Sequence, residues 1–107
     1  MRREQDLVHA VINYLNSKGH YVWRNNTGAI VSVYNGIKRF IRYGKKGSSD
    51  VIGVAKDGRM MAIECKIEGH KTDKLRFEDQ LRFLDVVRRR GGIAILAYKI
   101  DDVMGVL

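Results

Sequence analysis

Two short glycine turns constrain this chain more than any other feature, because each predicts a tight antiparallel hairpin. Asn-Gly and Asp-Gly dipeptides readily adopt the positive φ angles of two-residue hairpin turns. The turns and the strand-like runs beside them are 29–34, Asn35-Gly36 and 37–43, followed by 50–55, Asp57-Gly58 and 60–67. The middle of the chain is therefore expected to form two hairpins in succession.

A helix is predicted on each side of this hairpin region. Residues 3–18 carry apolar side chains at helical spacing, and Gly19 marks the end of this first helix. Residues 73–90 form the second helix, which Thr72 is expected to cap and Gly91-Gly92 to end.

The remaining segments complete an α/β fold class. Strands are predicted at 20–25 and 93–99, and residues 101–107 form a short helix or a loose end. Helices should therefore flank a central mixed sheet, and the second helix should lead to a strand parallel to an earlier one. The chain has 107 residues, no proline and no linker-like stretch, so residues 1–107 are expected to form a single domain.

Charge is the informative part of the composition. Twenty Lys and Arg against twelve Asp and Glu give a net charge of +8, which favours a polyanionic partner, with nucleic acid first. No apolar run is long enough to span a membrane, so a cytoplasmic protein without a membrane partner is expected. Cys65 is the only cysteine, and the histidines (His9, His20 and His70) lack ligand spacing, which argues against a zinc site.

The strand "MMAIECKIE" carries two charges on one face of an otherwise apolar segment. Glu64 and Lys66 are two residues apart, so both side chains point the same way. Asp50 begins the partner strand, and a hairpin centred on the Asp57-Gly58 turn pairs it roughly with residues 64–66. Two carboxylates and an amine are therefore expected to meet.

Each helix also directs one polar side chain inward. The apolar stripe of the second helix consists of Phe77, Leu81, Leu84 and Val87, and Gln80 falls on the same core-facing stripe. Glu4 similarly extends the apolar stripe of the first helix toward the helix start. Both polar groups are therefore expected near the charges on the sheet.

This set of groups suits metal-assisted hydrolysis of a phosphodiester. Close carboxylates repel unless a proton or a cation lies between them. Asp50 and Glu64 offer hard oxygen ligands suited to Mg²⁺ or Mn²⁺, and Lys66 can orient or help to deprotonate a water. Basic loops would hold the polyanionic substrate: we expect DNA contacts from Lys45, Lys46, Ser48, Arg24 and Asn26.

The segment "SSD" followed by "ECK" resembles the PD-(D/E)xK nuclease signature, with Asp50, Glu64 and Lys66 as its charged members. Glu4, and Gln80 within "FEDQLRFLDVVRRRGGIAILAY", resemble more specifically the VRR-NUC branch. This branch includes the nuclease domain of the Fanconi-associated nuclease and small stand-alone phage proteins. Ser49 stands where the family name has proline, a position without a chemical role.

The resemblance implies a PD-(D/E)xK nuclease fold with an αβββαβ core in one VRR-NUC domain. It also implies a DNA endonuclease that uses Mg²⁺ or Mn²⁺ and no small-molecule cofactor. Stand-alone members act as homodimers on four-way (Holliday) junctions, so the same is expected here. A phage-encoded protein would work in the cytoplasm of its bacterial host.

The resemblance also suggests a role for each site residue. Asp50, Glu64, Lys66 and Gln80 form the catalytic set, and the metal ligands are expected to be Glu4, Asp50, Glu64 and the backbone carbonyl of Cys65. Two alternatives stay open. One is a DNA-binding module that does not cut, and the other is a restriction-like endonuclease that cuts a short sequence.

Overall fold

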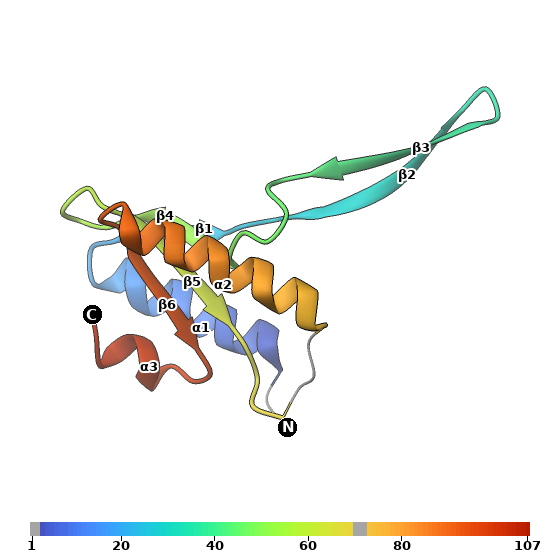
Figure 1. The fold of residues 1–107 in the computed structure, drawn as a ribbon. Coiled ribbons are helices and arrows are strands. Elements are labelled where there is room, and N and C mark those ends of the chain that lie inside the picture. The colour runs from blue at the N-terminus through green and yellow to red at the C-terminus, as the bar shows by residue number, and fades with distance from the viewer. Residues whose placement is uncertain (1–2, 70–72) are drawn as a thin grey trace.

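The computed structural model describes residues 3–69 and 73–107 (Figure 1). The elements in chain order are α1 (Glu4–Ser17), β1 (Tyr21–Arg24), β2 (Gly28–Tyr34), β3 (Ile37–Tyr43), β4 (Val51–Val54), β5 (Met60–Cys65), α2 (Lys74–Arg89), β6 (Ile93–Ala97) and α3 (Asp101–Met104). Their order confirms the predicted sequence of helices and strands, and most bounds lie within two residues of the expectation.

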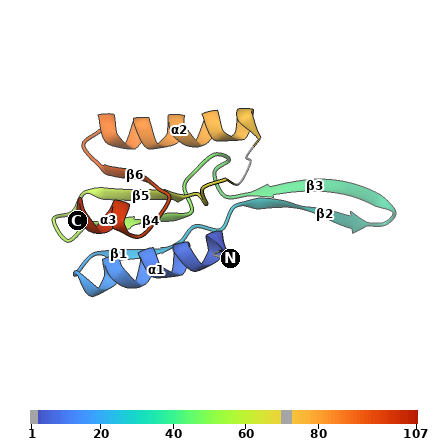
Figure 2. The same cartoon turned by 90° about the horizontal axis from the view of Figure 1, so that it is seen from below.

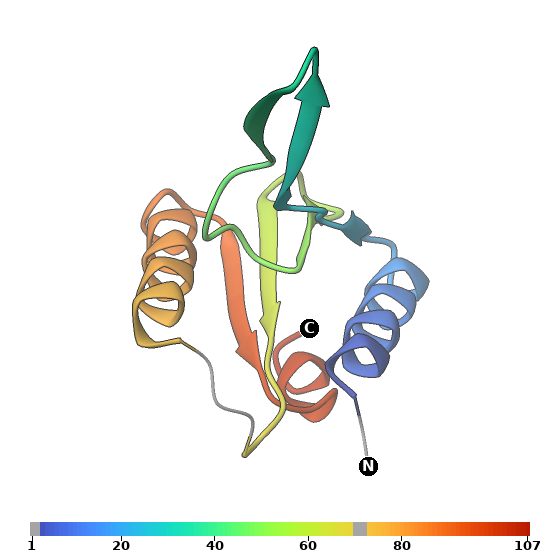
Figure 3. The same ribbon diagram turned by 90° about the vertical axis from the view of Figure 1, so that its right-hand side faces the viewer.

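A four-stranded sheet forms the middle layer, in the order β1-β4-β5-β6. β1, β4 and β5 are antiparallel neighbours, whereas β6 runs parallel to β5, so the sheet is mixed as predicted. α1 and α3 cover one face and α2 covers the other (Figures 2 and 3). These elements make up the αβββαβ core, with α3 added at the end.

Alternating side chains of β5 fill the two halves of the core. Met61, Ile63 and Cys65 pack with the buried stripe of α1, whose members are Leu7, Val8, Val11 and Leu15. Ala62, on the opposite face, packs with Leu84 and Val87 of α2. Each large apolar side chain buried in this way contributes about 1.5–3 kcal/mol, so β5 is the strand that holds the layers together.

The inward face of α2 differs from the prediction at one position. Gln80, Leu84 and Val87 are its buried residues, whereas Leu81 is 40% exposed. Gln80 thus lies on the buried stripe as predicted, whereas Leu81 does not. Thr72, the predicted cap, lies outside the described residues. Asp73 caps the helix, since its side chain accepts a hydrogen bond of 2.9 Å from the Leu75 amide.

Both glycine turns form as predicted. Asn35 and Gly36 have φ angles of 51° and 74°, and Gly58 has 94°. The hairpins differ in where they lie. β4 and β5 belong to the central sheet, whereas β2 and β3 form a separate two-stranded sheet that projects from it (Figure 1). We call residues 28–43 the arm.

The sequence did not reveal that the arm leaves the sheet. β1 pairs directly with β4, with Arg24 opposite Val51, so the segment between them is an insertion between two neighbouring strands. None of the helices in the described part of the chain has the length and apolar character needed to cross a bilayer.

Candidate active site

The β4–β5 hairpin brings Asp50 beside Glu64. Val51 lies opposite Ile63, so the next residues outward, Asp50 and Glu64, share the end of the ladder. The carboxylate of Asp50 accepts a hydrogen bond of 2.9 Å from the backbone N–H of Cys65. The structure thus confirms the predicted register. It holds the Asp50 carboxyl group against the β5 backbone directly after Glu64.

Glu64 is buried in a place that does not stabilise its charge. Its side chain is 1% exposed, and neither carboxyl oxygen meets a donor among the described residues. Burial is the main cause that raises the pKa of Glu64 to about 9. The adjacent Asp50 carboxyl raises it further through direct contact and charge, and Glu4 adds to this, while Lys66 opposes it. Two such carboxyl groups can touch only when a proton or a cation lies between them.

Gln80 supplies a third buried acceptor over the same spot. The helix α2 returns the chain from β5 to the parallel strand β6, so it runs antiparallel to β5. Because Leu84 packs with Ala62, Gln80, one turn before Leu84, lies toward the end of β5 that carries Glu64. Gln80 is 5% exposed, and its Oε1 has no partner among the described residues. Three buried acceptor atoms, on Glu64 and Gln80, thus lack the donors that buried acceptors normally find.

Lys66 lies beside these acceptors on the same face of the chain. Its side chain is 7% exposed, and its Nζ lies 5.4 Å from the centre of the Phe77 ring, one turn before Gln80 on α2. Its backbone N–H donates a hydrogen bond of 2.9 Å to the Ala97 carbonyl. The ammonium group is thus held close to the carboxyl pair by α2 and β6 together.

Glu4 and Cys65 stand at the edges of this group. Glu4 is the first residue of α1 and is partly buried, close enough for its charge to act on Glu64. Within residues 3–69 and 73–107, however, no three His, Cys, Asp or Glu side chains are gathered tightly enough to hold a metal. The Cys65 side chain points into the apolar core, where burial raises the pKa of its thiol. The roles predicted for Glu4 and for the Cys65 carbonyl remain predictions.

A braced loop positions Asp50. The Asn25 backbone N–H donates to the Asp50 carbonyl at 2.8 Å, and its side-chain amide donates to the Ser49 carbonyl at 2.9 Å and to the Ser48 hydroxyl at 2.6 Å. The Ser48 hydroxyl in turn donates to the Lys45 carbonyl at 2.6 Å. Ser49, where the family name has proline, is 1% exposed, and its hydroxyl donates to the Val51 carbonyl. The predicted DNA contact Ser48 is thus already engaged within the loop.

A polar cleft of about 410 Å³ opens onto Asp50. Its lining includes Arg24 and Asn26, two of the predicted DNA contacts, together with Asn25 and Arg76. Arg76 of α2 was missed in the sequence, although its position one turn before Gln80 was a usable signal. The cleft gives Asp50 an open side next to two guanidinium groups.

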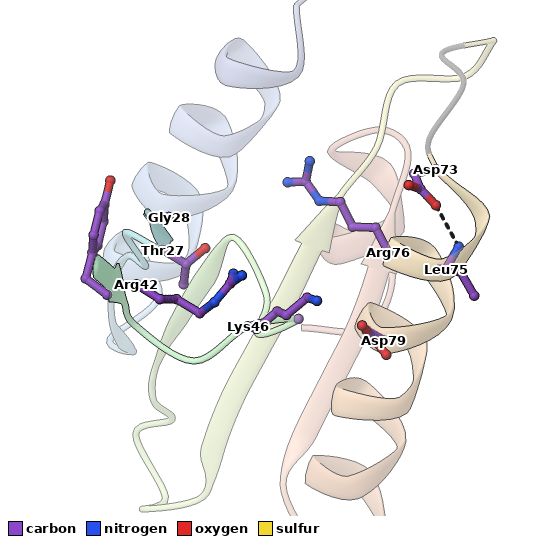
Figure 4. Close-up of a pocket in the computed structure, with 10 residues that line it drawn as sticks. Thr27, Gly28, Arg42, Lys46, Asp73, Leu75, Arg76 and Asp79 are labelled. Atoms are coloured by element: carbon purple, nitrogen blue, oxygen red, sulfur yellow. Dashed lines mark hydrogen bonds between the residues drawn. The ribbon is translucent and has the colours of Figure 1, made fainter. Parts of the chain in front are cut away.

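A second pocket of about 490 Å³ continues from this cleft toward the arm, and Thr27, Tyr43 and Arg76 line both. Figure 4 shows Arg42 and Lys46 reaching into this space from one side and Arg76 from α2 on the other. Lys46 was predicted to bind DNA, whereas Arg42 was not. The predicted contact Lys45 is exposed and lines neither pocket.

The segment that borders both pockets has charge of one sign only. Residues 24–49 contain six basic side chains and no Asp or Glu: Arg24, Lys38, Arg39, Arg42, Lys45 and Lys46. A run of this kind attracts a polyanion to the mouth of the cleft. The cleft that opens onto Asp50 is thus bordered by a cationic segment, and Asp79 of α2 and the helix cap Asp73 lie across the adjoining pocket.

The family model of the VRR-NUC domain matches residues 4–99, nearly the whole chain. The chain belongs to the VRR-NUC family. This family is part of the PD-(D/E)xK nuclease superfamily, and the mixed sheet flanked by helices agrees with that fold. Comparison with curated proteins and with solved structures finds no match. Membership indicates a nuclease-type function in DNA processing, in a superfamily whose domains generally use divalent metals.

Proposed function

We propose that this VRR-NUC protein is an endodeoxyribonuclease that depends on Mg²⁺ or Mn²⁺ and selects branched DNA. One observation carries the proposal: three buried acceptor oxygens, on Glu64 and Gln80, have no donor among the described residues, and the Asp50 carboxyl group and Lys66 act on Glu64. Buried acceptors that lack donors are costly unless a cation or a substrate satisfies them. The polar cleft beside Asp50 gives such a cation and a phosphate group a way in.

The donor set fits a hard divalent cation. Asp50 and Glu64 supply carboxylate oxygens and the Cys65 carbonyl a neutral one, and Glu4 would contribute through a water. Mg²⁺ and Mn²⁺ favour such oxygens and keep several waters. When bound, the ion would neutralise charge on the phosphate and lower the pKa of a bound water. Glu64 would have to lose its proton for this to occur, so binding should strengthen as the pH rises.

Lys66 and Gln80 would position the attacking water. Both are nearly buried and fixed between β5 and α2, so their orientation is set before DNA arrives. The ammonium group can hold a water in line with the phosphate or share its proton, and the Gln80 amide can accept or donate a hydrogen bond to that water. Arg24, Lys46 and Arg76 would bind the flanking phosphates at the cleft mouth.

Branch selectivity and a homodimer complete the proposal. One domain of this size has little surface for sequence reading beyond its cutting site, which suits recognition of DNA shape. Two symmetric cuts in a four-way junction require two active sites, and a twofold homodimer supplies them. This step rests on analogy with the family.

Asp50→Asn tests the site against a matched control in the same hairpin. The amide oxygen can still accept from the Cys65 amide, so the fold should persist, while the anionic ligand is lost. We expect cleavage to fall about 1,000-fold. Asp57→Asn removes an exposed carboxylate at the other end of the hairpin, where Asp57 pairs with Arg59 at 2.8 Å, and should leave cleavage within about twofold. Equal rates for the two variants would contradict the proposed site.

One gel assay separates this proposal from its rivals. Labelled duplex, flap, splayed and four-way substrates are incubated with and without Mn²⁺. The proposal predicts metal-dependent cutting that favours branched substrates, and Lys66→Ala should bind DNA without cutting. A module that only binds would cut none of them, and a restriction-like enzyme would yield discrete bands from linear duplexes. Uniform cutting of duplex and branched DNA would refute branch selectivity.

A further inference from the structure

The arm exposes apolar side chains that no other described element covers. All seven positions of β3 are exposed, and eight of the exposed large hydrophobic residues of the described chain belong to the arm. A lone two-stranded hairpin is marginally stable in water, and antiparallel sheets usually present one polar face to solvent. The arm has apolar side chains on both faces, which is typical of a surface that another molecule covers.

Strand register separates the arm into two unlike faces. Residues directly opposite each other share a face, so the pairs Ile30–Ile41 and Tyr34–Ile37 lie together, with Ser32–Arg39 between them. We call this the isoleucine face. The other face carries Val31–Phe40 flanked by the cations Lys38 and Arg42, and the Arg42 guanidinium lies 5.5 Å from the centre of the Phe40 ring. We call this the cationic face.

We propose that the isoleucine face of the arm packs on a second copy of this chain. Its four large apolar side chains are 43–75% exposed, which amounts to an area on the order of 500 Å². Two arms therefore remove on the order of 1,000 Å² from water, about the threshold for a specific interface. That sum does not yet include the surface that each arm would cover on its partner.

Charge selects a protein partner over DNA for this face. The isoleucine face has one cation among four large apolar side chains, whereas the cationic face has two cations among three smaller or partly covered ones, Val31, Val33 and Phe40. DNA-binding surfaces obtain most of their affinity from phosphate contacts. The isoleucine face offers few such contacts and much apolar area, while the cationic face remains free for DNA.

The position of the arm links this interface to the active site. The arm begins at Gly28 and ends at Tyr43, both of which line the pocket next to the cleft. An arm held by a second copy would therefore fix one border of each cleft and place two sites on one particle. This consequence rests on the proposed nuclease function, whereas the interface itself does not.

Sedimentation of matched arm variants tests the interface. Ile30→Thr with Ile41→Thr removes apolar area from the isoleucine face but keeps β-branched residues suited to a strand. Val31→Thr with Val33→Thr makes the same kind of change on the cationic face. We expect the first pair to raise the dimer dissociation constant about 100-fold and the second pair less than about fivefold. Equal effects, or a monomeric wild-type protein at high concentration, would overturn the proposal.

A cysteine probe identifies what covers the face. Cys65 is fully buried and should react slowly with maleimide. The rate of labelling therefore measures the exposure of a newly introduced cysteine. Ser32→Cys lies on the isoleucine face and Val33→Cys on the other. We expect labelling of Ser32→Cys to slow at least tenfold as protein concentration rises without DNA, while labelling of Val33→Cys changes little. Protection of Ser32→Cys by DNA only, or no protection at all, would overturn a second copy as the occupant.

Cleavage by the dimer-deficient pair separates the two proposals. The Ile30→Thr, Ile41→Thr protein retains every site residue, so it should still nick branched DNA with Mn²⁺ but lose paired cuts in a four-way junction. If the wild-type protein dimerises through the arm yet cuts nothing, the interface stands and the nuclease proposal fails. If the wild-type protein cuts DNA and the arm changes leave dimerisation intact, the nuclease proposal stands and the interface proposal fails.

Discussion

The two hairpins of this protein have similar turns and opposite surroundings. β4–β5 turns at Asp57-Gly58 and arm β2–β3 at Asn35-Gly36, each with a glycine at positive φ. Five of the six residues of β5 are buried, whereas every residue of β3 is exposed. Both hairpins are rich in apolar residues, so apolar content alone does not decide which hairpin becomes the core.

Chain connection explains the difference. β1 pairs with β4, and the Asn25 amide hydrogen-bonds to the Asp50 carbonyl, so the chain leaves the sheet after β1 and returns directly beside the same point. The segment between these residues joins no strand of the central sheet and projects from it. β5 lies between β4 and β6 and beneath α2, which leaves its polar residue Glu64 buried. Burial raises the pKa of the Glu64 carboxyl group in one hairpin, and exposure leaves the apolar side chains of the other open to solvent.

The largest expected difference between the hairpins comes from one methyl group. A Cβ on Gly53 would meet the Tyr21 carbonyl oxygen and lie 2.6 Å from the Val22 Cα, atoms of the β1 backbone that cannot rotate away. Gly53→Ala should therefore lower the free energy of unfolding by about 3 kcal/mol, the upper part of the range for overpacking. Urea denaturation followed by circular dichroism measures this change.

Gly36→Ala is the control in the arm. A Cβ there meets nothing within 4 Å, and only the φ angle of 74° opposes it, which costs about 1 kcal/mol of local arm stability. Global unfolding should change little. If Gly53→Ala proved as mild as Gly36→Ala, the close approach of β1 to β4 would be wrong.

Most of the fold followed from local sequence signals. The turn dipeptides, the helical periods and the glycine at the end of each helix set the element bounds, because each acts within a few residues. The projection of the arm depends on β1 pairing with β4 across 26 residues, from Arg24 to Val51. Both faces of the arm carry apolar residues. The alternation of side chains along its strands therefore did not indicate that the arm would stay outside the sheet.

A second difference concerns charge and acidity. The folded-state pKa of Glu64, about 9, lies above its ordinary value of 4.5, so between these pH values the folded protein holds a proton that the unfolded chain has released. The stability that this proton provides is complete below about pH 4.5 and is lost as the pH rises through 9. In chelator, wild-type protein should lose about 3 kcal/mol between pH 6 and pH 8.

Glu64→Gln removes this dependence, because an amide resembles the protonated acid and does not titrate. Its free energy of unfolding should stay level from pH 6 to pH 8, and Mg²⁺ should stabilise the wild-type protein at pH 8 but not the variant. Denaturant titrations at three pH values measure both effects. Parallel pH profiles for the two proteins would contradict the raised pKa.

The site was predictable where strand register and helix spacing determine it, and less so elsewhere. Asp50 and Glu64 meet because a tight turn sets the strand register, and helical spacing places Gln80 on the buried face of α2. Arg42 and Arg76 line a common pocket because the loop before Asp50 packs against α2. The approach is close: a Cβ on Gly47 of this loop would lie 3.0 Å from the Asp79 Cβ of α2. No period in the sequence encodes a contact of that kind between a loop and a helix.

The smallest expected effect is the removal of the arm itself. Replacing residues 29–42 by two glycines deletes seven of the eighteen exposed large hydrophobic residues of the described chain but no core residue. A shorter loop between β1 and β4 saves on the order of 0.6 kcal/mol of closure entropy for each halving of its length. At low protein concentration, the free energy of unfolding should therefore change by less than about 1 kcal/mol. At high concentration the wild-type protein alone should gain stability, because association favours the folded state. A loss of several kcal/mol at every concentration would mean that the arm supports its own core, and the contrast between the hairpins would disappear.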